Sequence, residues 1–475
     1  MIYEAVIGLE IHVQLNTATK MFCSCPNRPG DDPNTNICPI CLYLPGALPR
    51  LSLEAVEKAA QACLALNCEI QTESAFDQKV YYYPDLPKGF QLSQHHKPLA
   101  RNGWLEIEDE NGQPKKLRLH HVHMEEDVAK LVHETEGRTP ISLVDFNRAG
   151  TPLIEIVTEP DMRTPNDAME FLRVLRNQIR YTGCAECSME RGTMRCDANI
   201  SLRPRGSEGF NTKVEVKNMN SIRAVGNAID HEIERQAARL GAGKEIILHT
   251  RLWDPEKNVT TPMREKFAGP CVPDPSVPEI VVSEEWLKEL QGRLPEMPAQ
   301  KRARFVEQHG LLDDEAAFLS EDRELAGYYE SVVGEGIPPR TAAQWIASRL
   351  APALKERNQT VSDTLVTPPR MAELLALVEK RELSAHAARE ILLLLFETDK
   401  SPSAIMKEKD IGQIADSGAL ESLLDDVLAA HPDAVENYRK GKKKAAGFLV
   451  GQAMKASRGK ADPKILQELL QKKIG

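Results

Sequence analysis

The sequence predicts an α+β protein: an antiparallel-sheet cradle domain with a zinc knuckle, then an all-helical domain and a small helical tail domain. Short alternating strands and turn residues dominate up to about residue 290, and Ala, Leu, Glu, Lys and Arg at helical spacing follow. Paired cysteines near the N-terminus are typical of a metal-binding knuckle. We therefore expect domains at 1–292, 293–402 and 403–475, with the last boundary after the turn at Lys400-Ser-Pro402.

Composition supports this layout. The chain has 475 residues, 41% hydrophobic and 27% charged, which suits a folded protein of about three domains and excludes wholesale disorder. It starts without a basic leader and has no apolar run long enough for a membrane span, so we expect a cytoplasmic protein with no membrane partner. Net charge is −10, yet from Ala434 onward eleven Lys or Arg stand against three acidic residues. That asymmetry predicts a basic tail that contacts phosphates.

The first predicted strand carries a candidate site. Ile7, Leu9 and Ile11 alternate with polar residues, among them Glu10 and His12. One face of the strand should pack on a core, so the other presents a carboxylate and an imidazole two residues apart. A merely solvated strand face is an equally good interpretation of this segment alone.

Other segments repeat the design. Glu155 stands between two isoleucines, where a buried carboxylate needs a cation. Residues 120–127 gather three histidines and three carboxylates, which favours a divalent site for Mg²⁺ or Mn²⁺ over the alternative of a charged edge strand. Alternation at 194–203 and 213–217 adds further candidates on polar faces: Asp197, Lys213, Glu215 and Lys217.

The cysteines form two groups. Cys23-Ser-Cys25 and Cys38-Pro-Ile-Cys41 supply four thiolates on two short knuckles, which predicts structural Zn²⁺ with no open position for water; accidental spacing is the alternative. A second set, Cys184, Cys187 and Cys196, lacks a fourth ligand and is predicted to be buried or free thiols.

Several common catalytic motifs are missing from the sequence. It contains no GxxxxGK[ST], GxGxxG, GxSxG or HExxH motif, which removes the usual support for P-loop, Rossmann, hydrolase and zincin functions. The basic segment Lys440–Lys444 precedes two amphipathic stretches and suits a nucleic-acid backbone, although a solvated lysine-rich helix is as good an interpretation.

Several long segments, in order, resemble the family of aspartyl/glutamyl-tRNA(Asn/Gln) amidotransferase B subunits: IGLEIHVQL, YYYPDLPKGFQLSQ, HMEEDVAKLVH, SLVDFNRAGTPLIEIVTEPDM, RCDANISLRP and GFLVGQAMKASRGKA. The resemblance covers nearly the whole chain. It implies an ATP-using subunit that phosphorylates the side-chain carboxylate of Glu-tRNA(Gln) or Asp-tRNA(Asn) and amidates it with ammonia. The ammonia would come through a channel from an amidase subunit, and a small third subunit would wrap the pair.

The resemblance also implies site residues. The family's metal ligands correspond to His12, Glu126 and Glu155, with Glu10 beside them. Strand parity alone would put Glu125 on the face of His121 and His123, whereas the family match favours Glu126. Candidates for neutralising phosphates are Lys79, Arg148, Lys213 and Lys217, and the remaining catalytic candidates are Glu10, Glu125, Asp197 and Glu215.

Two departures from the family pattern stand out. The loop from Lys266 to Pro278 lacks the usual aromatic and acidic run, and Arg191 replaces a glutamate. Two rival functions remain: a non-catalytic tRNA and zinc adaptor, and a metal-dependent phosphotransferase acting on a small molecule.

Overall fold

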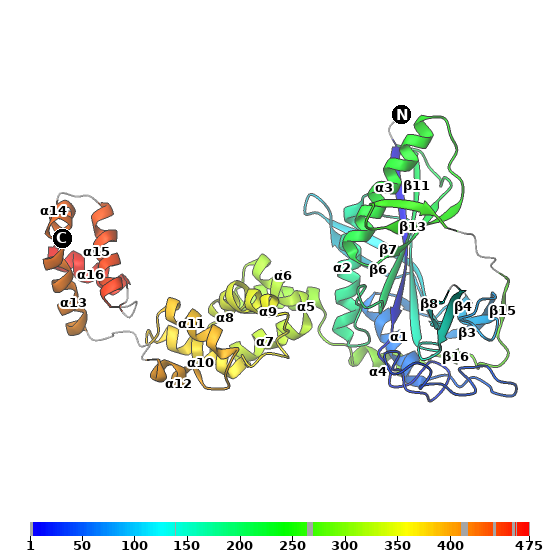
Figure 1. The fold of residues 1–475 in the computed structure, drawn as a ribbon, viewed down its shortest axis with the longest axis horizontal. Coiled ribbons are helices and arrows are strands. Elements are labelled where there is room, and N and C mark those ends of the chain that lie inside the picture. The colour runs from blue at the N-terminus through cyan, green and yellow to red at the C-terminus, as the bar shows by residue number, and fades with distance from the viewer. Residues whose placement is uncertain are drawn as a thin grey trace. The chain divides into compact units, whose positions relative to one another are not determined.

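One large, almost entirely antiparallel sheet is the frame of the N-terminal part of the chain (Figure 1). The computed structural model describes residues 3–137, 139–263, 269–409, 417–439, 443–457, 461 and 463–474. The chain divides into two compact units, Met1–Met297 and Pro298–Gly475.

The main path of the sheet runs β14-β13-β12-β11-β1-β10-β7-β4-β3-β15. Its neighbours pair antiparallel except β12 and β13, which are parallel. The strands on this path are β1 (Tyr3–Gln14), β3 (Glu73–Val80), β4 (Phe90–Lys97), β7 (Pro114–Glu126), β10 (Pro152–Thr158), β11 (Met194–Pro204), β12 (Val214–Met219), β13 (His249–Asp254), β14 (Val259–Pro262) and β15 (Cys271–Pro273). Short strands join beside them: β2 (Glu69–Ile70), β5 (Ala100–Arg101), β6 (Trp104–Glu108) and β16 (Ile280–Val281). A separate hairpin consists of β8 (Lys130–Glu136) and β9 (Thr139–Asp145).

The apolar face of the sheet holds the core of this unit. Ile7, Leu9, Ile11 and Val13 of β1 are at most 1% exposed. They share one hydrophobic cluster with buried residues of α1 (Leu53–Ala65), α2 (Pro165–Thr182) and α3 (Ile222–Gly241), and α2 and α3 contact each other. Each fully buried aliphatic side chain stabilises the fold by about 1.5–3 kcal/mol, so this face fixes the orientation of β1. The unit ends with α4 (Glu284–Gly292).

Local sequence signals start and stop these helices. Ser52 and Ser221 accept hydrogen bonds from the first-turn amides of α1 and α3. Thr164 and Asp167 form a reciprocal capping box at the start of α2. Gly183, with a φ of 76°, ends α2 in the left-handed conformation that glycine adopts without strain.

The second unit is helical in every element that the structure describes, and it contains two separate hydrophobic clusters. One extends from Phe305 to Ile405 and the other from Leu420 to Leu470. The first comprises α5 (Pro298–His309), α6 (Asp313–Glu321), α7 (Arg323–Gly334), α8 (Pro339–Trp345), a π-helical turn (Ile346–Leu350), α9 (Ala351–Arg357), α10 (Pro368–Glu379), α11 (Ala385–Leu395) and α12 (Pro402–Glu408). The second comprises α13 (Ser417–Ala430), α14 (Pro432–Arg439), α15 (Lys443–Ala456) and α16 (Pro463–Ile474).

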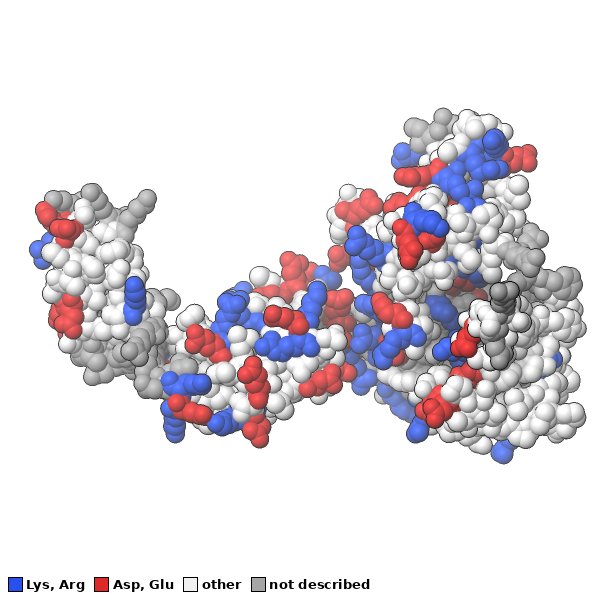
Figure 2. Space-filling model, in the orientation of Figure 1, with Lys and Arg blue, Asp and Glu red and all other residues white. Residues whose placement is uncertain are grey.

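The expected mixed fold with a large sheet is confirmed, whereas the boundaries at 292 and 402 stay predictions. Figure 2 shows cationic and anionic side chains interspersed over the helices of the second unit. Parts of the predicted basic segment, Lys440 and Lys442, lie outside the described residues, as does the start of the atypical loop at Lys266. Within the described part of the chain, no helix has the length and apolarity that crossing a membrane requires.

Candidate functional site

Polar side chains form rows across the sheet on the face opposite the core. His12 of β1 pairs with Glu155 of β10, which pairs in turn with His123 of β7. Two residues along β1, Glu10 pairs with Asp197 of β11. Because alternate residues of a strand share a face, these rows bring together side chains that are far apart in the sequence.

Two carboxylates and two imidazoles meet at the centre of these rows. His12 Nε2 lies 3.3 Å from Glu125 Oε1 and 3.4 Å from Glu155 Oε2. His123 Nε2 lies 3.1 Å from the same Glu155 oxygen. One ligand atom each from His12, Glu125 and Glu155 lie within 4.8 Å of one another, which fits a divalent cation that accepts oxygen and nitrogen ligands. We refer to these three residues as the acidic cluster.

Charge is strongly coupled within the acidic cluster. Burial opposes protonation of His12, but its hydrogen bond to Glu155 and the neighbouring carboxylates raise its pKa to about 9. Burial raises the pKa of the Glu125 carboxyl, and the positive charges nearby, Lys79 included, only partly oppose that rise. Burial also acts on Glu155, but hydrogen bonds from His12 and His123 hold its pKa well below the ordinary value. Burial and the attraction between the His12 imidazole and the carboxylates therefore act against each other in this cluster.

Glu125 and Glu126 of β7 have different partners. Adjacent residues of a strand point to opposite faces, so Glu125 faces His12 whereas Glu126 faces away from it. Glu126 instead pairs with Lys88, and its Oε1 accepts a hydrogen bond of 2.9 Å from the amide of Leu92. Glu125, the residue that strand parity favours, therefore lies beside His12, and the assignment of Glu126 as a metal ligand stays a prediction.

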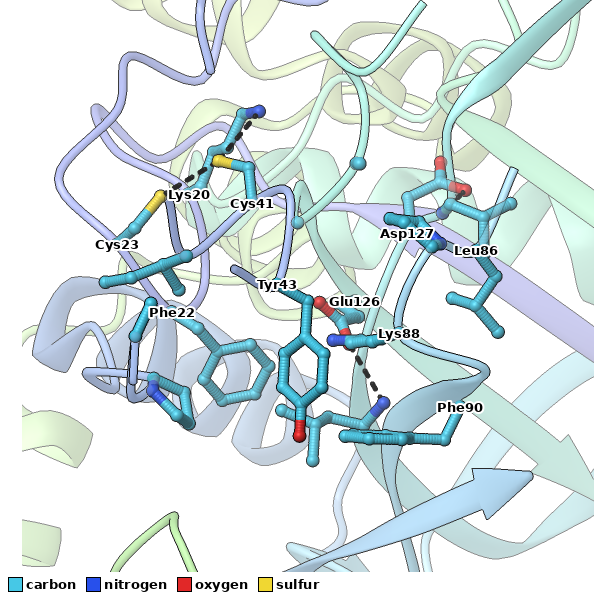
Figure 3. Close-up of a pocket in the computed structure, with 18 of the residues that line it drawn as sticks. Lys20, Phe22, Cys23, Cys41, Tyr43, Leu86, Lys88, Phe90, Glu126 and Asp127 are labelled. Carbon is cyan, nitrogen blue, oxygen red and sulfur yellow. Dashed lines mark hydrogen bonds and ion pairs between the residues drawn. The ribbon is translucent and has the colours of Figure 1, made fainter. Parts of the chain in front are cut away.

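Glu126 and Lys88 lie at one side of a small cavity (Figure 3). The cavity has a volume of about 40 Å³, and the aromatic rings of Phe22, Tyr43 and Phe90 line it. Figure 3 shows Cys23, Cys41 and Lys20 on its other side. It thus lies between the cysteine loop and the strand that carries Glu125.

The other predicted residues of the polar face are joined by hydrogen bonds and ion pairs. Asn199 donates to Glu10 Oε1 over 2.9 Å. Lys217 pairs with Asp197 and, at 3.0 Å, with Glu215. These groups extend the rows of polar side chains to one side of the acidic cluster.

An open cleft of about 310 Å³ adjoins Glu10. Lys213, Asn199 and Gly8 line it, and Lys213 is exposed there. Burial is the main cause that raises the pKa of Glu10, and the ammonium of Lys213 partly offsets the rise. Lys213 at the rim of this cleft can attract an anionic ligand, whereas the Glu10 carboxylate at its wall favours a cation.

Two predicted cations lie differently from the rest. Lys79 of β3 is exposed, and its charge acts on Glu125. Arg148 donates to the carbonyl oxygens of Val128 and Ala129, over 2.9 and 2.8 Å, and so supports the loop after β7. The interpretation of Arg148 as a phosphate-neutralising residue stays a prediction.

The four cysteines of the predicted zinc knuckle converge. Sulfur atoms of Cys23, Cys25, Cys38 and Cys41 lie within 4.8 Å of one another. The Cys41 sulfur lies 3.4 Å from the sulfur of Cys23, 3.7 Å from that of Cys38 and 3.8 Å from that of Cys25. The edge of a zinc–sulfur tetrahedron with bonds of about 2.3 Å is about 3.8 Å, so the four residues fit this metal. The hydrogen bond from Cys23 lowers the pKa of the Cys41 thiol to about 4. Burial opposes this change, and the nearby ammonium of Lys20 supports it.

The second group of cysteines differs. Cys184, Cys187 and Cys196 are buried and carry free thiols, as predicted. Burial raises the pKa of each of these thiols.

The cysteine loop is tied to the segment that precedes β10. The Asn36 amide donates to Asn147 Oδ1 over 2.8 Å, and Asn147 Nδ2 donates to the carbonyl of Asp32 over 2.8 Å. Lys20, which is fully buried, donates to the carbonyl oxygens of Asn36 and Phe146 over 2.8 and 3.1 Å. These bonds link the cysteine cluster to the strand that carries Glu155.

Two of these residues, Lys20 and Lys88, were not identified from the sequence. They carry no periodic signal, since their partners come from distant segments. Strand parity had placed His123 on the face of Glu125, as the structure has it, but assigned it no role of its own.

The chain matches two families of known domains. The GatB/GatE catalytic domain covers residues 5–288, and the GatB domain covers residues 327–474. The chain is 62% identical to one aspartyl/glutamyl-tRNA(Asn/Gln) amidotransferase B subunit of Syntrophus aciditrophicus, covering 100% of this chain and 99% of that protein. It is 47% identical to the corresponding B subunit of Carboxydothermus hydrogenoformans, covering 99% of both chains. Identity to the B subunit of Thermosynechococcus vestitus is 48%, covering 99% of this chain and 96% of that protein.

Proposed function

The chain belongs to the family of aspartyl/glutamyl-tRNA(Asn/Gln) amidotransferase B subunits, and on that premise we propose that it activates and amidates the side-chain carboxylate of a misacylated tRNA. As a member of this family it is part of a multi-subunit amidotransferase with a ligase-type activity. The proposed substrates are Glu-tRNA(Gln) or Asp-tRNA(Asn), ATP and ammonia. An amidase subunit and a small third subunit are the proposed partners.

The chemistry requires an activated acyl group. A carboxylate is a poor acceptor for ammonia, because its leaving group would be an oxide. In the proposed reaction the substrate carboxylate attacks the terminal phosphorus of ATP, and ADP leaves. Ammonia then attacks the acyl carbon, phosphate leaves, and the nitrogen loses one proton.

The acidic cluster carries this proposal. His12, Glu125 and Glu155 would hold Mg²⁺ or Mn²⁺, which would neutralise phosphate oxygens as charge develops. The cleft beside Glu10 offers space next to the cluster for the nucleotide. Lys213 and Lys217 lie on that side and would attract the phosphates.

We further propose that the small cavity beside Lys88 and Glu126 admits ammonia from the partner amidase. Its volume of about 40 Å³ exceeds the roughly 10–15 Å³ that a cavity needs to hold one water molecule, which is similar in size to ammonia. The Glu126 carboxylate, beside Lys88, could accept a hydrogen bond from entering ammonia. Zinc at the four cysteines would hold one wall of this cavity in place, because Cys23 and Cys41 line it.

Replacing Glu155 tests the proposal. We expect Glu155→Gln, purified with its partner subunits, to lose at least about 100-fold in ATP-dependent amidation of misacylated tRNA. Glutamine hydrolysis by the partner should remain measurable. The matched control is Glu106→Gln, an exposed carboxylate on β6 of the same sheet, and it should amidate normally.

The rival functions predict other results. For a non-catalytic adaptor, ATP consumption would not depend on Glu155. For a small-molecule phosphotransferase, removing the tail would leave turnover unchanged. Amidation by Glu155→Gln within tenfold of the unmodified complex would refute the proposed metal site.

A further inference from the structure

We infer that His123 is a fourth protein ligand of the divalent cation at the acidic cluster, so that two imidazoles and two carboxylates hold the ion. The inference depends on the proposed function only in that both place a cation at this cluster. It adds a ligand to the set and, through that ligand, a preference among metals.

The positions of the two imidazoles suggest a shared ion. His12 Nε2 and His123 Nε2 lie 3.4 and 3.1 Å from one oxygen of Glu155. The same two nitrogens lie near different oxygens of Glu125: His12 Nε2 is 3.3 Å from Oε1, and His123 Nε2 is 3.9 Å from Oε2. Neighbouring ligand atoms around an octahedral ion with bonds of about 2.1 Å are about 3 Å apart. The four side chains would therefore need to move by only a few tenths of an ångström to surround an ion, and His123 would move most.

A buried carboxylate oxygen without a hydrogen-bond partner points to the same place. Glu125 Oε2 is buried without a hydrogen-bond partner among the described residues, and its side chain is only 3% exposed. A buried carboxylate oxygen with no donor is costly, and a bound cation removes that cost. This oxygen is the one that lies 3.9 Å from His123 Nε2.

His123 is held in position for the role. Its side chain is 9% exposed, and its ring stacks on that of His121 with centroids 5.2 Å apart and planes 18° apart. Backbone pairing with Glu155 on β10 fixes the strand position beneath it. The imidazole therefore meets the ion with little further loss of rotational freedom.

The ligand set has a chemical consequence. Two neutral imidazoles and two carboxylates balance the charge of a divalent ion and leave two of six octahedral positions for substrate oxygens. Imidazole ligands favour transition metals, whereas Mg²⁺ favours oxygen alone. The site should therefore bind Mn²⁺ more tightly than Mg²⁺.

A different role for His123 would be to orient Glu155 by a hydrogen bond without touching the ion. Metal affinity does not separate the two roles, because losing an outer partner also weakens binding by about 10–100-fold. Counting the nitrogens bonded to the metal does separate them.

The experiment uses the complete amidotransferase complex with Mn²⁺ as the probe, and electron spin echo spectroscopy counts the coordinated imidazole nitrogens. We expect two in the unmodified complex and one each in His12→Gln and His123→Gln. His121→Gln is the matched control, since this ring stacks on His123 but belongs to no ligand set proposed here, and it should retain two.

A single nitrogen in the unmodified complex overturns the inference, and this result needs no variant to fold. So does a His123→Gln spectrum identical to that of the unmodified complex, or the absence of bound Mn²⁺. An amidation assay on the same samples keeps the two proposals apart. Activity with one nitrogen refutes only the role of His123, and two nitrogens without activity refute only the proposed function.

Discussion

Replacing Lys20 should destabilise the sheet unit more than any surface cation would. Its side chain is fully buried, and its ammonium lies 3.6 Å from the sulfur of Cys41. It also donates to the carbonyl oxygens of Asn36 and Phe146. Lys20→Met keeps the volume but leaves two carbonyls without this donor and the cysteine thiolates without a cation.

The size of the effect follows from these contacts. Removing one partner of a buried ion pair typically costs about 3–5 kcal/mol, since the other charge stays buried. For a domain of this size each kcal/mol shifts the melting temperature by roughly 2–4 °C. We therefore expect Lys20→Met to melt on the order of 10 °C lower and to release zinc to a chelator faster.

Circular dichroism melting and zinc content by mass spectrometry provide the measurement. Lys97→Met is the matched control, because Lys97 forms exposed ion pairs with Glu73 and Glu279. It should melt within about 2 °C of the unmodified protein. If Lys20→Met also melts within that margin, the buried ammonium does not hold the cysteine loop, and the reasoning is wrong.

Two further predictions concern the tail and acid stability. Deleting residues 434–475 removes eleven Lys and Arg. In a filter-binding assay, the affinity for tRNA should therefore fall and should depend much less on salt concentration. An unchanged dependence on salt would contradict a tail that binds phosphates. Burial tends to raise the pKa of Asp77, but hydrogen bonds from His96 and His95 outweigh it and lower that pKa. A lowered pKa in the folded state contributes stability above the unfolded value of about 3.9 and loses it as pH falls through the folded value. The free energy of unfolding in urea should therefore depend less on pH below about pH 4 for Asp77→Asn than for the unmodified protein. If the free energies of the two proteins change with pH in parallel, the Asp77 carboxylate contributes nothing to acid stability.

Periodicity predicted the parts of the site that lie on long strands. The alternation of β1 placed Ile7, Leu9 and Ile11 in the core and Glu10 and His12 on the polar face, as the structure has them. The reason is physical, since burying the wrong face of such a strand would place charges in the core. Close spacing in the sequence likewise made the convergence of the four cysteines predictable.

What periodicity could not supply was the set of partners. Lys20 binds backbone carbonyls, which have no sequence signature, and Lys88 lies in a turn segment far in sequence from Glu126. Arg148 likewise donates to backbone carbonyls, those of Val128 and Ala129, which the sequence could not indicate. Strand parity placed Glu125 on the face of His123, as the structure has it, whereas the role of Glu126 as a metal ligand stays a prediction.

The place of β1 within the sheet has a consequence for synthesis. Its two neighbours are β10 and β11, which follow it by more than a hundred residues. During synthesis, β1 therefore cannot pair with both neighbouring strands until about residue 204 has been added to the chain. Nascent chains of that length expose a strand edge that invites aggregation. The acidic cluster, whose residues come from β1, β7 and β10, cannot form before these strands have paired.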